Sequence, residues 1–216
     1  MNFLIVIPSY NHNKYIPKLI QKLDKYNVLV VDDGSNTPIT FKNDRNNINL
    51  IRNKINRGKG YSIKKAAKYA KNNNYTHIIT IDSDLQHNAN DLKQFVLKGI
   101  KNDLVYGYRS NFKKMPYLRI ISNKITSYLI SKSCNKKIYD SQSGYRLYNL
   151  CLFDNLDSKE DGYQFESEIL LKKINIHSKI DYVNIETIYN NSVSHFSKTL
   201  DTFKFIKMYI NIIFRL

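Results

Sequence analysis

The chain has 216 residues, which is long enough for one domain with a complete hydrophobic core. Tyrosine (17) and phenylalanine (10) are plentiful while glycine (7) and proline (4) are scarce, so the composition excludes a disordered or low-complexity protein. Lysine and arginine outnumber aspartate and glutamate by 34 to 18, which gives a formal net charge of +16. This charge favours polyanionic partners: nucleic acid, anionic lipid or a phosphorylated substrate.

Strand patterns alternate with helix patterns along the first two thirds of the chain. Strands are predicted at residues 3–7, 28–32, 48–52, 78–81 and 103–109, and helices at 14–26, 60–73, 90–101 and 118–131. Such alternation predicts an α/β fold with a mostly parallel sheet covered by helices on both faces. In these sheets ligands bind beyond the carboxyl ends of the strands, where this sequence places its polar loops.

The stretch IDSD places two acids directly after an apolar strand. Residues two apart in an extended chain point to the same side, so Asp82 and Asp84 would face one spot. Two carboxylates that close repel each other unless something positive lies between them. A turn that caps the next helix is the alternative interpretation.

Six motifs follow one another along the chain: VIPSYN, VDDGS, NRGKG, IDSDLQH, DSQSGYR and FESE. Together they resemble the family-2 glycosyltransferases of the GT-A fold, and within that family the dolichyl-phosphate mannose synthase group with its bacterial polyprenyl-phosphate relatives. The resemblance covers residues 1–195. It implies a single Rossmann-like domain, taken as residues 1–198, and leaves residues 199–216 as an amphipathic carboxyl-terminal helix.

The resemblance implies an activity and a cofactor. Such enzymes move a sugar from a nucleoside diphosphate sugar, here GDP- or UDP-linked, to an acceptor such as a polyprenyl phosphate of the dolichyl or undecaprenyl type. Mg²⁺ or Mn²⁺ would neutralise the charge that grows on the departing diphosphate. Asp82 and Asp84 would bind this metal, and by resemblance Gln86 would join them.

A nucleotide site is implied at the ends of the first strands and in the NRGKG loop. Its residues are Pro8, Tyr10, Asn11, Asp32, Asp33, Arg57, Gly58, Lys59, Asp82 and Ser83. By resemblance Asp32 or Asp33 accepts hydrogen bonds from the base or ribose, and the NRGKG loop lies beside the phosphates. A helix cap at Asp33 and a solvated basic loop are the alternatives.

Four residues are candidates for the reaction itself: Asp84, Asp140, Arg109 and Arg119. By resemblance the two arginines approach the donor and acceptor phosphates, because a guanidinium binds phosphate bidentately. Asp140 would position the acceptor or act as a base. A solvated helix face is the alternative for Arg119, and a structural role is the alternative for Asp140.

Three segments are expected to support the site. Arg146 is interpreted as structural, paired with a carboxylate beneath the site, and Glu166 as ordering its loop. Ser194 and His195 resemble a segment that closes over the pyrophosphate in some relatives.

Two other functions compete with transfer to a polyprenyl phosphate. The first keeps the donor and transfers to a sugar hydroxyl of a growing surface glycan. The second is nucleic-acid binding, which is disfavoured because acids gather where a nucleic-acid groove should be basic. We therefore expect no nucleic-acid partner, and homo-oligomerisation stays open.

The cellular location is inferred from the cysteines and from the two ends of the chain. Cys134 and Cys151 lack metal or redox spacing and are predicted to be free thiols, and the short apolar run at the start predicts a strand, not a signal peptide. We therefore expect a cytoplasmic protein. The helix at 199–216 is too short and too charged to span a bilayer. It is expected to dock on the domain, to pair with a second copy, or to lie at the cytoplasmic face of a membrane. The membrane is favoured because a polyprenyl phosphate is membrane-bound.

Overall fold

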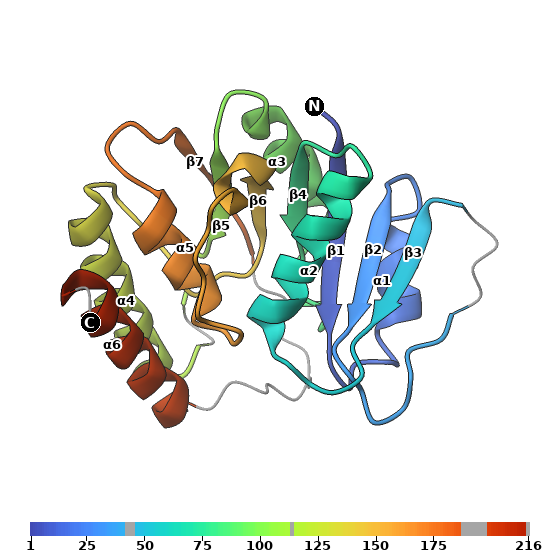
Figure 1. Ribbon diagram of the computed structural model, residues 1–216, viewed down its shortest axis with the longest axis horizontal. Helices are drawn as coiled ribbons and strands as arrows, with labels where there is room; N and C mark the ends of the chain where they lie inside the picture. Colours follow the sequence, from blue (N-terminus) through green and yellow to red (C-terminus); the bar gives the residue numbers. More distant parts are fainter. Residues whose placement is uncertain (42–45, 113–114, 187–197, 215–216) are drawn as a thin grey trace.

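Seven strands and six helices form the regular structure of the part of the chain that the computed structural model describes, residues 1–41, 46–112, 115–186 and 198–214 (Figure 1). The strands are β1 (Phe3–Ser9), β2 (Val28–Asp32), β3 (Ile48–Arg52), β4 (His77–Thr80), β5 (Leu104–Tyr108), β6 (Arg146–Asn149) and β7 (Ile180–Asn184). The helices are α1 (Ile16–Lys22), α2 (Lys59–Asn72), α3 (Leu92–Gly99), α4 (Tyr117–Cys134), α5 (Phe165–Lys173) and α6 (Lys198–Phe214), with 3₁₀ turns η1 (Ala89–Asp91) and η2 (Leu150–Phe153).

The strands form one sheet in the order β3-β2-β1-β4-β6-β5-β7. Among the described strands only β6 runs antiparallel to its neighbours, β4 and β5, while the other pairs are parallel. The mostly parallel α/β fold expected from the sequence is confirmed. Because the parallel strands share a direction, their carboxyl ends meet at one edge of the sheet, and the amino end of β6 reaches the same edge.

Both faces of the sheet are buried at its centre, as β1 illustrates. Leu4 and Val6 belong to the core that contains α2, whereas Ile5 and Ile7 belong to the core that contains α1. Successive side chains of a strand point to opposite faces, so these four residues, all fully buried, join the sheet to both helical layers. Nearly continuous apolar strands are what a parallel sheet with two covered faces requires.

Three elements in the second half of the chain were not predicted from the sequence: β6, α5 and β7. The strands β6 and β7 are short and carry polar residues, so their own pattern does not announce a strand. They exist because β6 pairs with β4 and β5, and β7 pairs with β5. The FESE motif opens α5, and Phe165 at its start is fully buried.

The carboxyl-terminal helix α6 packs against α4 and α5. Phe205 and Met208 of α6 are buried in the core of the domain. A hydrogen bond of 3.3 Å joins Ser122 to Thr202, and a second of 2.9 Å joins Ser133 to Tyr209, so α4 and α6 run in the same direction, side by side. Among the described helices, none is both long and apolar enough to cross a bilayer.

The packing of α6 predicts different effects for two neighbouring phenylalanines. Phe205→Ala should lower the free energy of unfolding by about 3 kcal/mol, because it leaves a cavity in the core. Phe203→Ala, on the exposed side of the same helix, should change it by less than about 0.5 kcal/mol. Urea unfolding of both variants tests this, and equal effects would mean that α6 does not pack as described.

Candidate functional site

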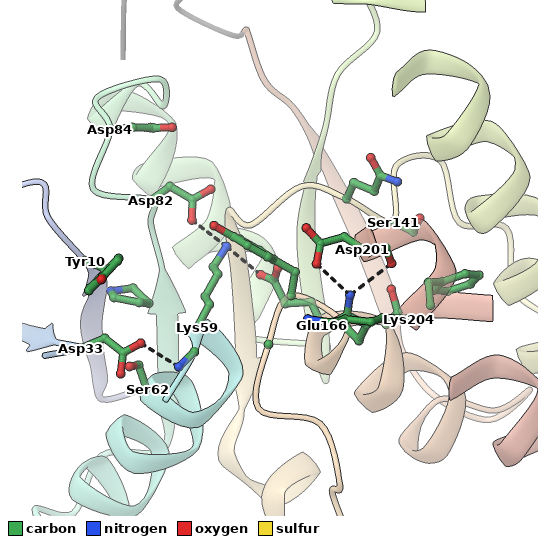
Figure 2. A pocket seen from close by; sticks show the side chains of 18 of the residues that line it. Tyr10, Asp33, Lys59, Ser62, Asp82, Asp84, Ser141, Glu166, Asp201 and Lys204 are labelled. Carbon is green, nitrogen blue, oxygen red and sulfur yellow. Dashed lines mark hydrogen bonds and ion pairs between the residues drawn. The ribbon is translucent and has the colours of Figure 1, made fainter. Parts of the chain in front are cut away.

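A pocket of about 510 Å³ opens at the edge of the sheet where the parallel strands end (Figure 2). Its first half, here called the strand half, is lined by Pro8, Tyr10, Asp33, Gly58, Lys59, Asp82, Ser83 and Asp84. Its second half, here called the helix half, is lined from α4, α5 and α6 and the segments next to them by Arg119, Ser122, Ser141, Gln142, Gln164, Asp201 and Lys204.

The pocket brings together most of the residues that the sequence singled out. Those that line it are Pro8, Tyr10, Asp33, Gly58, Lys59, Asp82, Ser83, Asp84 and Arg119. Those that do not line it are Asn11, Asp32, Arg57, Gln86, Arg109 and Asp140. Ser194 and His195 lie outside the described residues.

Lys59 connects the two halves of the pocket by charge. Its ammonium lies 2.6 Å from Oδ1 of Asp82 and 3.2 Å from Oε1 of Glu166, and Figure 2 shows it reaching from the start of α2 toward both. Burial opposes the charged form of Lys59, but the two carboxylates outweigh it and raise the pKa of Lys59. Lys59 therefore stays charged, and it is not a freely solvated basic side chain.

Asp82 is engaged on both of its oxygens. Its Oδ1 contacts Lys59, and its Oδ2 lies 3.2 Å from Nε2 of His87. Burial opposes its ionisation, but the nearby ammonium lowers the pKa of Asp82 well below the ordinary range. The carboxylate is thus ionised and held in a fixed position.

Gly144 leaves room for this ion pair. A Cβ atom at this position would lie 2.3 Å from Nζ of Lys59 and 2.6 Å from Oδ2 of Asp82. A side chain here would push Lys59 or Asp82 out of their contact, so the glycine of the SGYR motif is explained by close approach and not by a special backbone angle.

Asp84 differs from Asp82 in its surroundings. Burial and the charge of Asp82 raise the pKa of Asp84, while a backbone hydrogen bond of 3.0 Å from Gln86 to its Oδ1 works in the opposite direction. A divalent cation would remove the repulsion between the two acids. Among the described residues no group of three histidines, cysteines or acids could hold a metal.

The donor set fits a hard divalent cation that is shared with a substrate. Mg²⁺ is commonly held by one or two carboxylates together with substrate phosphates, and it keeps some of its water. Asp82 and Asp84 supply two such carboxylates in the strand half. Gln86 is not among the residues that line the pocket, and its backbone donates a hydrogen bond of 3.0 Å to Oδ1 of Asp84.

Asp33 holds the NRGKG loop. Its Oδ1 accepts a hydrogen bond of 3.0 Å from the backbone of Arg57, and its Oδ2 accepts one of 2.7 Å from the backbone of Gly58. Gly58 has φ of +105°, and a Cβ there would lie 2.4 Å from the carbonyl oxygen of Asp161. The side chain of Arg57 is half exposed and pairs with Asp161 at 3.6 Å, away from the pocket.

Asp32 is structural, which differs from the nucleotide contact expected for it. Its carboxylate is fully buried, pairs with Arg52, and accepts backbone hydrogen bonds from Ser35 and Ile39. The carboxylate of Asp32 therefore stabilises the turn after β2. Asn11 acts in the same turn, because its backbone donates to Ser35 and its side chain accepts from Asn36.

Arg109 and Asp140 form a buried bidentate ion pair beneath the helix half. Nε of Arg109 lies 2.6 Å from one carboxylate oxygen of Asp140, and an Nη atom lies 2.8 Å from the other. Asn123 donates to the same carboxylate at 2.8 Å. Burial would raise the pKa of Asp140, but Arg109 lowers it. In this arrangement Arg109 faces a carboxylate instead of a phosphate, and Asp140 is shielded from an acceptor.

Arg146 is structural, as expected, but its partners differ from the expected carboxylate. Its guanidinium is fully buried and donates to the backbone carbonyls of Ser143, Glu166 and Ser141 at 2.6 to 2.8 Å. The bonds to Ser141 and Ser143 brace the SGYR segment itself, and the bond to Glu166 fastens it to α5. Glu166, whose backbone is held in this way, faces Lys59 with its side chain.

Sequence reasoning missed the residues that close the helix half. Gln164 precedes α5, and Asp201 and Lys204 lie in the first turns of α6. The amide of Gln164 donates to the side chain of Asp201 at 3.3 Å, which joins the two helices at the pocket (Figure 2). The sequence predicted a helix at 199–216 and left open whether it docks on the domain, pairs with a second copy or lies at a membrane, so none of its residues was placed at the site.

Comparison with known proteins shows the family of the chain. The model of glycosyl transferase family 2 matches residues 4–156. An uncharacterized protein of Methanocaldococcus jannaschii is 33% identical over 98% of this chain and 99% of its own length. The UDP-N-acetylglucosamine–dolichyl-phosphate N-acetylglucosaminyltransferase of Methanococcus voltae is 30% identical over 86% of this chain and 85% of its own length.

Solved structures share the fold. Glucosyl-3-phosphoglycerate synthase of Mycobacterium tuberculosis, in complex with Mn²⁺, UDP-glucose and phosphoglyceric acid, matches with a TM-score of 0.75 at 14% identity, covering 98% of this chain and 79% of that one. The chain therefore belongs to glycosyltransferase family 2 and has the GT-A fold. It is a glycosyltransferase, as its motifs implied.

Removal of the Lys59 ammonium should destabilise the fold. Lys59→Met leaves two largely buried carboxylates without their cation, so we expect the free energy of unfolding to fall by about 3 kcal/mol. The matched control is Lys98→Met, because Lys98 and Asp181 form an ion pair of 2.8 Å that is more than one third exposed. The control should cost less than about 1 kcal/mol. Equal losses in urea unfolding would contradict the central role of Lys59.

Two arginine replacements should separate a structural guanidinium from one in the pocket. Arg109→Lys loses a bidentate buried contact, so the free energy of unfolding should fall by about 2 to 3 kcal/mol. Arg119→Lys should leave stability within about 0.5 kcal/mol and lower turnover by about tenfold or more. If instead Arg109→Lys were stable but lost turnover, Arg109 would contact a substrate phosphate, as the sequence resemblance implied.

Proposed function

We propose that this glycosyltransferase moves a sugar from a UDP-linked donor to a polyprenyl phosphate with the help of Mg²⁺ or Mn²⁺. The observation that carries the proposal is the division of one pocket into two halves. One half holds the paired carboxylates of Asp82 and Asp84. The other holds cations and hydroxyl groups, and its described acids, Glu166 and Asp201, each already contact another side chain. Each half matches one substrate.

The strand half suits the nucleoside diphosphate sugar. Tyr10 and Pro8 offer an apolar wall for a base, and Asp82 and Asp84 would hold a cation against the diphosphate. When bound, the cation would neutralise the charge on the leaving diphosphate. A UDP-linked donor, in preference to a GDP-linked one, is supported by the Methanococcus voltae relative, whose name gives UDP-N-acetylglucosamine, and by the solved structure with UDP-glucose and Mn²⁺.

The helix half suits an anionic acceptor. Arg119 and Lys204 bring two cations to it, and Ser122, Ser141 and Gln142 bring neutral hydrogen-bonding groups. An anionic phosphate oxygen can attack the anomeric carbon directly while the bond from that carbon to the donor diphosphate breaks. The nucleoside diphosphate leaves with the bonding electrons, so the step needs no proton acceptor.

Transfer to a sugar hydroxyl is less well supported. A hydroxyl must lose its proton to a base within hydrogen-bond reach. Among the described acids near the helix half, Asp140 is buried against Arg109, Glu166 pairs with Lys59, and Asp201 is buried and accepts a hydrogen bond from Gln164. An acceptor that is already ionised avoids this requirement, and the Methanococcus voltae relative is named for such an acceptor, a dolichyl phosphate.

The location proposed for the enzyme is the cytoplasm. Cys134 and Cys151 are both free thiols, as expected from their spacing. Free thiols of this kind are typical of a reducing compartment. A basic protein in that compartment could reach a lipid acceptor from the cytoplasmic leaflet.

Asp84→Ala should lower sugar transfer by at least about a hundredfold, because the cation loses one of its two carboxylates. The measurement is transfer of radiolabelled sugar from UDP-glucose and UDP-N-acetylglucosamine to polyprenyl phosphate, extracted into organic solvent. Asp154→Ala, at an exposed acid paired with Lys71, is the control and should retain full transfer. Transfer by the wild type that persists in the presence of a chelator would contradict the proposed requirement for a metal. Transfer to a free oligosaccharide alone would contradict the proposed polyprenyl phosphate acceptor.

A further inference from the structure

One end of the molecule carries a concentration of exposed apolar side chains. Both α4 and α6 lie at this end, beyond α5 as seen from the sheet (Figure 1). The large apolar residues exposed on the two helices are Tyr117, Leu118, Ile121, Ile125, Tyr128, Phe203, Ile206, Ile210, Ile213 and Phe214. They are ten of the 17 exposed large apolar residues in the described chain, so the exposure is concentrated and not scattered.

The two helices present these side chains as one continuous face. On α4, Leu118 and Ile125 lie four residues before and three residues after Ser122, the residue that bonds to α6. On α6, Ile206 and Ile213 lie three before and four after Tyr209, which bonds back to α4. Residues three or four apart are neighbours on a helix surface, so each apolar stripe begins beside the line where the helices meet.

The charged side chains that α4 and α6 themselves expose are of one sign. Lys124 and Lys132 are exposed on α4, and Lys204 and Lys207 are exposed on α6. The sequence of α4 contains no acid, and the only acid of α6 is Asp201, which is buried at the pocket. An apolar strip with lysines and without exposed carboxylates complements a surface that is apolar in depth and anionic at its head groups.

The face is continuous with the pocket. The first turns of α4 and α6 supply Arg119, Ser122 and Lys204 to the helix half of the pocket, and the apolar stripes begin in the same turns with Leu118 and Phe203. We propose that the α4–α6 face docks on an anionic lipid bilayer and holds the mouth of the helix half at the level of the lipid head groups. The purpose of that orientation rests on the proposed polyprenyl phosphate acceptor, but the docking itself does not.

Vesicle binding tests the docking without any catalysis. The full chain should sediment with phosphatidylcholine vesicles that contain phosphatidylglycerol, less with phosphatidylcholine alone, and less again at high salt. The triple variant Ile125→Ser, Phe203→Ser, Phe214→Ser should bind at least about tenfold more weakly. The matched control replaces exposed apolar residues elsewhere, as Leu97→Ser, Ile100→Ser, Ile176→Ser, and should bind like the wild type.

A reporter makes the test independent of the stability of the triple variant. The chain contains no tryptophan, so Phe203→Trp and Leu97→Trp each introduce a single fluorophore at a highly exposed position. On addition of anionic vesicles the emission of the first variant should shift to the blue and be quenched by brominated lipid, whereas the second should stay unchanged. Equal behaviour of the two reporters, or no vesicle binding by the wild type, overturns the proposal.

Two further outcomes are distinct. If the wild type forms a dimer in solution, the triple variant is monomeric, and neither binds vesicles, the face is a dimer interface and the proposed docking on a bilayer is wrong. If the protein binds vesicles but transfers no sugar to polyprenyl phosphate, the docking stands and the proposed acceptor is wrong. If both hold, the triple variant should lose transfer to acceptor in vesicles but keep transfer to acceptor dispersed in detergent.

Discussion

The contact of Lys59 with Asp82 and Glu166 holds the site together. It joins the start of α2, the loop after β4 and the first turn of α5 through one ammonium group. Burying three charges is costly, and the arrangement is stable only because opposite charges compensate one another at short range. The same contact explains the room left by Gly144, and it sets one acid of the IDSD motif apart from the other.

The remaining buried charges divide into those that hold the scaffold and those that face the pocket. Asp32 with Arg52, and Asp140 with Arg109, are closed pairs that use their hydrogen-bonding capacity inside the protein. Asp84 lies in the pocket, with a pKa raised by burial and by the charge of Asp82. Asp82, which also lines the pocket, shares its charge with the ammonium of Lys59, so the two acids of the IDSD motif differ in their surroundings.

The helices α4 and α6 each have an inner side that packs on the domain and an outer side that is exposed. Their inner sides bury Phe205, Met208 and Ile130 in the core, and their first turns deliver polar groups to the pocket. Their outer sides remain apolar although they are exposed. A helix that is apolar around most of its circumference needs a second apolar environment, and the proposed bilayer, next to the proposed site for a lipid phosphate, would provide it.

The sequence by itself determined the alternation of strands and helices, the parallel sheet, and the gathering of Asp33, Asp82 and Asp84 at one edge. These features follow from local periodicity, and parallel strands necessarily bring their carboxyl ends together. Only the tertiary structure decided which partner each charge has. Arg109 and Asp140 are 31 residues apart, and Lys59 and Glu166 are farther apart still, so no local pattern shows their pairing. The same is true of β6 and β7, which are strands because β5 lies between them, and of α6, whose first turn closes the pocket because Phe205 and Met208 find the core.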